Sequence, residues 1–144
     1  MANSIKFRIR REPIDDRDDG ISPYIHLEDP DEDIENLEQP NEIVTPKDIR
    51  IRFRYPLSQE FVFEYHNTNN GYTRRELAKL ISDEYKRIYE EEEEDDGDPG
   101  MIPGMYNRNS SHGRYGIWGH YLGDLLLHEV ISEGGGMYRL GIDS

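Results

Sequence analysis

Apolar and charged residues alternate in two neighbouring stretches of this chain. Within residues 49–55, apolar side chains take every second position and arginines take all the positions between them. Residues 60–65 repeat the alternation after a short turn sequence at residues 56–59. Because successive side chains of a strand point to opposite faces, the pattern predicts a two-stranded hairpin with one apolar face and one arginine-bearing face.

A period of three and four residues replaces the alternation farther along the chain. Thr73 and Glu76 form a capping-box pattern, and Tyr72 and Leu77 have the spacing of a hydrophobic staple. Apolar residues then recur along one side of a helix, at Leu77, Leu80, Ile81, Tyr85, Ile88 and Tyr89. We predict an amphipathic helix that packs this stripe on the sheet. Its charged positions are expected to face water, namely Arg74, Lys79, Asp83, Lys86 and Arg87.

Three further stretches are typical of strands. Residues 5–10 alternate like the first hairpin strand, which predicts an N-terminal strand able to share its sheet. Residues 125–131 and 137–142 flank a glycine-rich turn sequence and predict a second hairpin. A short helix from Asp124 to Gly134 is the alternative, since short apolar runs do not separate the two periods. The predicted fold class is α+β, a small mixed or antiparallel sheet of hairpins packed on one amphipathic helix.

Polar and acidic sequences separate these elements. Residues 12–46 are rich in acids and prolines, which predicts either a free linker or a strap docked over the arginine-bearing faces of its flanking strands. We expect the helix to fray in its acid run, residues 90–96, because negative charges accumulate at the negative end of the macrodipole. Residues 95–114 have the composition of a mobile loop. We therefore divide the chain into an N-terminal strand (1–11), an acidic linker or strap (12–46) and a core domain (47–144).

Charge and composition narrow the classes of function. The formal net charge of −14 repels nucleic-acid phosphates and favours a protein partner with a basic surface. The absence of cysteine excludes disulfides and thiolate chemistry. The sequence shows no apolar signal-like start and no run long enough to span a bilayer, so we expect a soluble intracellular protein without membrane association.

Three residues are candidates for a metal site. On a continuous helix, His120, Asp124 and His128 would line one face and present ligands to a metal. Gly119 and Gly123 interrupt such a helix, and a strand over residues 125–131 would scatter the ligands, so surface histidines are the alternative. The other carboxylates lie in solvated runs where nothing raises a pKa for acid–base chemistry. We predict no catalytic residue and no cofactor.

Aromatic and acidic residues are candidates for binding a partner. The aromatic side chains predicted to gather near the His120 loop are Tyr115, Trp118, Tyr121 and Tyr138. Such clusters are enriched at binding hot spots, although they can also close the end of a core. Within the acid run, Glu91, Glu92 and Glu93 are predicted to steer or hold a basic partner.

The strand residues suggest a further hypothesis, nucleic-acid binding. Its basic residues are Lys6, Arg8, Arg10, Arg50, Arg52 and Arg54. The net charge opposes it, and Glu60 and Glu64 are placed to neutralise the neighbouring arginines in cross-strand pairs. The leading hypothesis is therefore a non-enzymatic protein-binding module. Its oligomeric state stays open, because an N-terminal strand on a flexible tether can exchange between protomers in a swapped dimer.

Two resemblances accompany these patterns. The order of hairpin, helix and further strands over residues 47–143 resembles ubiquitin-like β-grasp folds, which implies a recognition module; residues 141–144 lack the diglycine ending of ubiquitin, which argues against conjugation. Residues 115–120 together with residues 123–125 resemble a signature of small acidic domains of large DNA viruses of eukaryotes. That second resemblance implies a viral or host-interaction role and brings no assigned activity or site residue.

Overall fold

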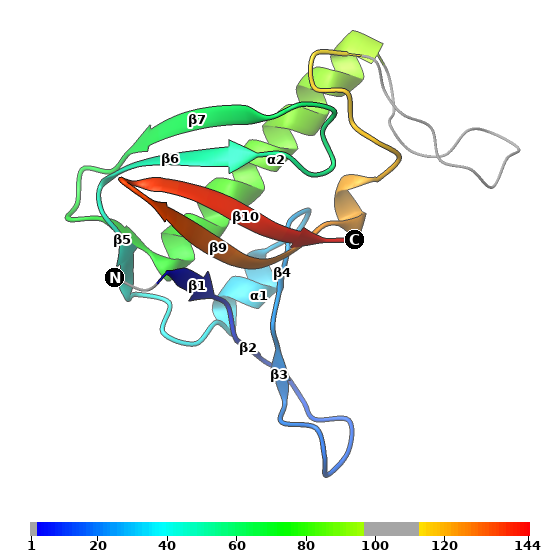
Figure 1. Cartoon of the computed structure of the whole chain (residues 1–144). Coiled ribbons are helices and arrows are strands. Elements are labelled where there is room, and N and C mark those ends of the chain that lie inside the picture. The colour runs from blue at the N-terminus through cyan, green and yellow to red at the C-terminus, as the bar shows by residue number, and fades with distance from the viewer. Residues whose placement is uncertain (1–2, 97–112) are drawn as a thin grey trace, which may run out of the picture.

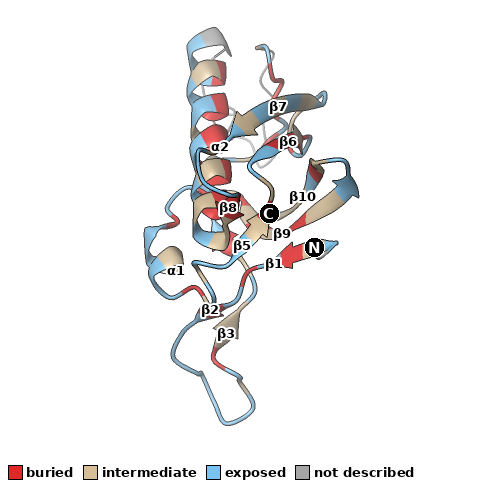
Figure 2. Ribbon diagram, turned by 90° about the vertical axis from the view of Figure 1, so that its left-hand side faces the viewer, coloured by how far each residue is buried: buried red, intermediate tan, exposed pale blue. Residues whose placement is uncertain are grey.

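The structure is a computed structural model that describes residues 3–96 and 113–144. Most of the loop predicted at residues 95–114 therefore lies outside the described residues. A mixed sheet forms the centre, with strand order β1–β9–β10–β6–β7 and with β4 also beside β9 (Figure 1). Its strands are β1 (Ser4–Lys6), β4 (Ile25–His26), β6 (Asp48–Phe53), β7 (Phe61–His66), β9 (Leu126–Gly134) and β10 (Met137–Asp143). Helix α2 (Arg74–Asp96) packs on one face, so the predicted α+β class is confirmed (Figures 1 and 2).

The first predicted hairpin is confirmed as β6 and β7. The two strands pair antiparallel in an unbroken register from Asp48 opposite His66 to Phe53 opposite Phe61. The apolar residues Ile49 and Ile51 are buried toward α2, whereas Arg50 is exposed on the other face. The alternating pattern therefore identifies the buried face of the strand directly, because successive side chains point to opposite faces of the sheet.

The predicted start of the helix is confirmed. The Thr73 backbone N–H donates to Glu76 Oε1 at 2.9 Å, and the Glu76 N–H donates to Thr73 Oγ1 at 3.1 Å. The buried stripe of α2 faces the sheet (Figure 2). Arg74 departs from the prediction, because its guanidinium turns inward to the Lys6 carbonyl oxygen at 3.0 Å and to Glu42 at 2.8 Å.

The predicted fraying of the acid run is wrong, since α2 continues to Asp96. Two of its acids have partners that offset the charge. Arg87, one helical turn before Glu91, donates to Glu91 Oε2 at 2.5 Å. Glu92 is fully buried and accepts backbone hydrogen bonds from a neighbouring segment. These contacts outweigh the unfavourable position of negative charge near a helix C-terminus.

The C-terminal hairpin is confirmed as β9 and β10, which pair antiparallel around a turn of glycines. Gly135 and Gly136 have φ of 62° and 78°, a region that favours glycine. β10 also pairs with β6 in parallel, and β1 pairs with β9, so the N-terminal strand shares the sheet as expected. The short helix considered for residues 124–134 is replaced by a strand preceded by a single 3-10 turn, η1 (Leu122–Asp124).

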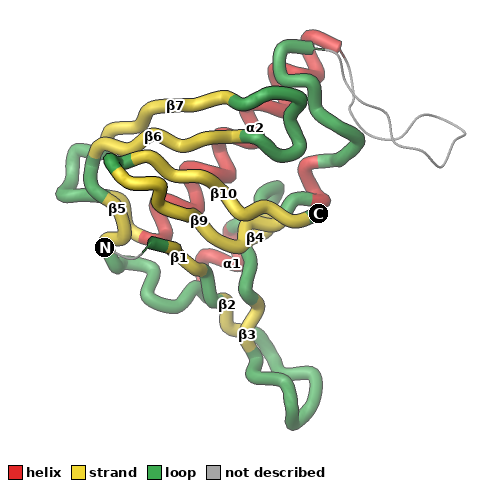
Figure 3. Tube along the Cα trace, viewed as in Figure 1, coloured by secondary structure: helices red, strands yellow, loops and turns green. Residues whose placement is uncertain are grey.

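The acidic segment 12–46 packs against the core as a series of short elements (Figure 3). They are β3 (Ile21–Ser22), which pairs with β2 (Ile9–Arg10), then β4, α1 (Asp31–Glu35) and β5 (Ile43–Thr45), which pairs with β8 (Tyr72–Thr73). Ile25, Leu27 and Leu37 are part of the hydrophobic core. Glu38 pairs with both Arg8 and Arg10, at 2.9 and 3.1 Å. The segment therefore contributes core residues and ion pairs, as a docked strap would.

No helix in the described residues has the length and apolar character that crossing a bilayer requires.

Candidate functional site

Exposed aromatic side chains gather beyond the end of β6. Tyr55, Trp118 and Tyr121 are 36%, 62% and 40% exposed, and largely buried His120 lies between the first two. Tyr55 Oη lies 2.9 Å from His120 Nε2, and the Trp118 and His120 ring centroids are 5.7 Å apart, edge to face. We call Tyr55, Trp118, His120 and Tyr121 the aromatic patch. It presents aromatic ring surface to solvent, and aromatic side chains are enriched at binding hot spots.

The turn after β6 positions this patch. The Trp118 backbone N–H donates to the Pro56 carbonyl oxygen at 2.8 Å, and the Ser58 N–H donates to the Tyr115 carbonyl oxygen at 3.1 Å. Gly116 has φ of 61°, and a Cβ at this position would collide with the Ser58 hydroxyl. Backbone bonds thus hold the segment that carries Trp118 and leave its indole exposed.

Glu92 holds the same segment from the other side. Its carboxylate accepts the backbone N–H groups of Gly113, Tyr115 and Gly116 at 3.0, 2.9 and 2.9 Å. Glu91 pairs with Arg114 at 2.6 Å. Of the three acids predicted to hold a partner, Glu92 is thus buried and Glu91 is engaged within the chain, whereas Glu93 is exposed. Periodicity could not reveal this, because the donors of Glu92 lie more than twenty residues away in sequence.

An acidic groove adjoins the aromatic patch. It runs between α2 and η1, has a volume of about 500 Å³ and is lined by Glu28, Lys86, Tyr89, Glu90, Glu93, Tyr121 and Leu122. Tyr121 belongs to both the groove and the patch. Among the described residues, Glu28, Glu90 and Glu93 are exposed and form no ion pair. These three carboxylates give the groove a negative potential next to aromatic surface.

The structure separates the four predicted aromatic residues into two groups. Tyr115 and Tyr138 are buried in the core, as in the alternative that they close its end. Trp118 and Tyr121 lie in the aromatic patch. The sequence pattern did not identify Tyr55 as a surface residue, because its place in the alternation resembled that of a strand residue with an inward side chain. The strand ends at Phe53, so Tyr55 leaves the sheet.

The three predicted metal ligands do not converge. His120 Nδ1 lies 4.0 Å from Asp124 Oδ2, whereas His128 lies on β9 and its Nε2 pairs with Asp143 at 3.0 Å. In residues 3–96 and 113–144, no three His, Asp or Glu side chains are placed to hold a metal. The helix on which the site depended is absent, because the chain forms η1 and then a strand.

Four of the strand arginines, Arg8, Arg10, Arg52 and Arg54, are neutralised within the chain, whereas Arg50 forms no ion pair among the described contacts. Arg52 donates to Glu60 at 2.8 Å and to Glu133 at 2.7 Å. Arg54 lies 3.9 Å from Glu60, as the cross-strand pairing proposed from the sequence requires. Arg8 and Arg10 pair with Glu38. Such pairs leave little positive potential for nucleic acid.

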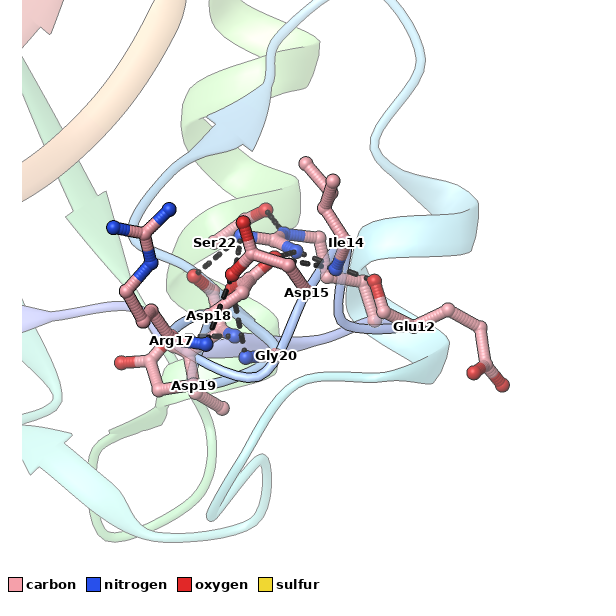
Figure 4. Close-up of polar contacts among 10 residues, drawn as sticks. Glu12, Ile14, Asp15, Arg17, Asp18, Asp19, Gly20 and Ser22 are labelled. Atoms are coloured by element: carbon pink, nitrogen blue, oxygen red, sulfur yellow. Dashed lines mark hydrogen bonds and ion pairs between the residues drawn. The ribbon is translucent and has the colours of Figure 1, made fainter.

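A polar loop between β2 and β3 projects from the body of the protein (Figures 1 and 4). The Asp18 carboxylate accepts two hydrogen bonds from Arg11, at 2.6 and 3.0 Å, and the backbone N–H groups of Ile14 and Gly20, at 2.8 and 2.9 Å. The Arg11 guanidinium and these N–H groups hold the pKa of Asp18 well below its usual range. Ile14, 86% exposed, stands on this fixed loop. No signal of the sequence pointed to it.

Aromatic ring faces beside carboxylates suit the binding of cationic side chains through cation–π and ionic contacts. The sequence matches no protein-family model, and no curated protein or solved structure matches it. The chemistry of the aromatic patch and the acidic groove is therefore the best guide to function.

Proposed function

We propose that this chain is a non-enzymatic protein-binding module that holds a basic partner on the aromatic patch and in the acidic groove. The observation that carries the proposal is the position of Tyr121, which joins exposed aromatic surface to a groove with three carboxylates that form no ion pair within the described chain. A Lys or Arg side chain in this groove would meet carboxylates and a ring face together.

The two surfaces contribute in different ways. Burial of Trp118 and Tyr121 supplies most of the affinity, because large aromatic side chains dominate binding energies. The carboxylates are exposed, so each ion pair adds only about 0–1 kcal/mol. Together with the net charge of −14, they accelerate the encounter with a basic partner at low salt.

The topology supports the same class of function. The β6–β7 hairpin, α2 and the β9–β10 hairpin follow one another, and β10 lies parallel to β6. This order supports the proposed resemblance to β-grasp recognition modules. A second role, in metal binding, gains no support from the positions of His120, Asp124 and His128 described above.

The proposal is tested with a defined library of short peptides in which Lys, Arg and apolar residues are randomised. Selection on the intact chain is expected to enrich peptides that carry both basic and apolar residues. Trp118→Ala should lower the affinity of an enriched peptide about tenfold or more, since truncating a hot-spot aromatic costs roughly 2 kcal/mol. The control is Ile14→Ala, which removes an exposed apolar side chain on the projecting loop between β2 and β3.

A second test removes the charge of the groove with matched triple variants. Glu28→Gln, Glu90→Gln and Glu93→Gln together should weaken the peptide strongly at low salt and little at high salt. The matched control is Glu12→Gln, Asp16→Asn and Glu35→Gln, which makes the same change of net charge at exposed acids elsewhere. Equal effects of the two triple variants, or binding that is unchanged in Trp118→Ala, would show that the site is wrong.

A further inference from the structure

The strand β7 forms one edge of the central sheet. Its only neighbour in the described residues is β6 (Figure 3). It is six residues long, whereas the elements at the opposite edge, β1 and β4, have three and two residues. Its register with β6 contains no bulge. β7 is thus a long and regular edge strand.

The backbone pairing shows which groups of β7 point outward. The Asn67 N–H donates to the Lys47 carbonyl oxygen at 2.8 Å, and this pair continues the β6–β7 register by one step. In antiparallel strands, hydrogen-bonded and non-hydrogen-bonded pairs alternate. The N–H and C=O groups of Phe61, Phe63 and Tyr65 therefore face β6. Those of Val62, Glu64 and His66 face away from the sheet.

These outward groups have no partner in the described chain. No hydrogen bond in residues 3–96 and 113–144 uses the backbone N–H or C=O of Val62, Glu64 or His66. Proteins usually protect such an edge with proline, lysine, a bulge or a covering segment. β7 has none of these in its sequence or register and consists largely of aromatic and β-branched residues. Its edge is ready to pair with another strand.

We propose that β7 accepts an extended segment of a basic partner as an added strand. Hydrogen bonds to Val62, Glu64 and His66 would supply the pairing, as in other cases of strand addition. The inference shares with the proposed function only the basic character of the partner, because it uses a different surface.

The side chains of β7 specify the chemistry of that segment. Glu64 is exposed on the open face of the sheet, where its register partner on β6 is Arg50, and it forms no ion pair among the described contacts. A Lys or Arg placed opposite Glu64 on the added strand would pair with it. On the face of α2, Phe61 and Phe63 are half-buried, and the Arg87 guanidinium lies over the Phe63 ring at 4.9 Å from its centroid. The ring surface that stays exposed is offered to apolar side chains. The segment therefore alternates basic and apolar residues. A second copy of this chain is disfavoured by the net charge of −14 on each protomer.

The test uses a capped peptide of alternating lysine and valine, with an alternating glutamate and valine peptide as control. Amide hydrogen exchange, followed by NMR, measures the protection of each backbone N–H group. The lysine peptide should slow exchange at Val62, Glu64 and His66, whose N–H groups face outward. The amides of Phe61, Phe63 and Tyr65 are already protected by β6 and should change little.

Variants separate backbone pairing from side-chain contact. Val62→Pro removes one outward donor and leaves the bonds to β6 intact, so the fold persists and affinity falls about tenfold. Val62→Ala keeps the N–H and should bind nearly as the native chain does. Glu64→Lys should reverse the preference, so that this variant binds the glutamate peptide more tightly than the lysine peptide. Far-UV circular dichroism and urea unfolding verify that each variant folds.

Three outcomes would overturn the inference. One is the absence of new protection at β7 with the lysine peptide. Another is equal binding by Val62→Pro and Val62→Ala. The third is protection of β7 that rises with protein concentration alone, because it would identify a second copy as the occupant. Trp118→Ala should leave binding at β7 unchanged, so failure of the aromatic patch and failure of the β7 edge are distinguishable.

Discussion

Glu92 Oε1 accepts the backbone N–H of Tyr115 at 2.9 Å and joins the C-terminal half of α2 to the segment that carries Trp118. The carboxylate is fully buried and receives two more backbone N–H groups. Glu92, one residue in a run of glutamates, therefore satisfies backbone donors of this loop and holds the loop in place. The contact fixes Trp118 indirectly, because Tyr115 and Trp118 belong to the same short segment.

Replacing Glu92 should destabilise the fold. Glu92→Ala leaves three backbone donors without an acceptor, the buried N–H groups of Tyr115 and Gly116 and the half-buried N–H of Gly113, and each buried group costs roughly 1–3 kcal/mol. We expect the free energy of unfolding to fall by about 3 kcal/mol in urea titrations. Tryptophan fluorescence of the folded variant should also shift, since the segment around Trp118 loses its anchor.

The neighbouring acid provides the control for this prediction. Glu93 is exposed, so Glu93→Ala should change the free energy of unfolding by no more than about 0.5 kcal/mol. Equal effects at the two positions would contradict the role given to Glu92.

The acidic segment is expected to contribute to global stability. Leu27 is completely buried, its N–H donates to the Leu125 carbonyl oxygen at 3.2 Å, and its carbonyl oxygen accepts the Ser82 hydroxyl at 2.6 Å. Leu27→Ala should cost about 2–5 kcal/mol, as for other large-to-small core substitutions. Ile14→Ala, in the exposed loop of the same segment, should cost at most about 0.5 kcal/mol. Small and equal effects would mean that residues 12–46 do not fold with the core.

The capping box should make stability depend on pH in the acid range. The hydrogen bond from the Thr73 backbone N–H holds the pKa of Glu76 below its ordinary value. Since the folded pKa is the lower one, this stabilisation is complete above the unfolded pKa and is lost as pH falls through the folded pKa. Glu76→Ala should therefore lower the free energy of unfolding by roughly 0.5–1 kcal/mol at neutral pH. The difference should shrink toward pH 3, measured by urea unfolding at several pH values between about 3 and 7.

Glu90→Ala is the matched control on the same helix. Its side chain is exposed and forms no ion pair among the described contacts, so the stability difference from the native chain should stay small at every pH. A Glu76→Ala difference that is constant down to pH 3 would rule out the capping contribution.

Buried tyrosines should limit stability at alkaline pH. Burial raises the pKa of Tyr85, and burial together with the hydrogen bond to Glu84 raises the pKa of Tyr65. Because the folded pKa values are the higher ones, their stabilising contribution is complete below the unfolded pKa, near 10, and declines as pH rises beyond it. Absorbance at 295 nm should show fewer tyrosines ionising in the native chain than the ten that titrate in denaturant. Ionisation of all ten near pH 10 in a folded sample would contradict this.

Local patterns in the amino-acid sequence were sufficient to predict the individual elements. The alternation of residues 49–55 and 60–65 defined the β6–β7 hairpin and its buried face, and the pair Thr73 and Glu76 marked the start of α2. These signals are readable because each depends on residues a few positions apart. The exposure of Trp118 and Tyr121 was anticipated only as a hypothesis, since aromatic residues suit both a core and a surface.

Which of these elements contact one another depends on the packing of the whole chain. The burial of Glu92 and the parallel pairing of β10 with β6 join segments far apart in the chain, and no local pattern encodes such a contact. The inward turn of Arg74 has the same origin, because its acceptors belong to β1 and to the acidic segment. Periodicity fixes the direction in which a side chain points, whereas the partner that it meets depends on how the whole chain packs.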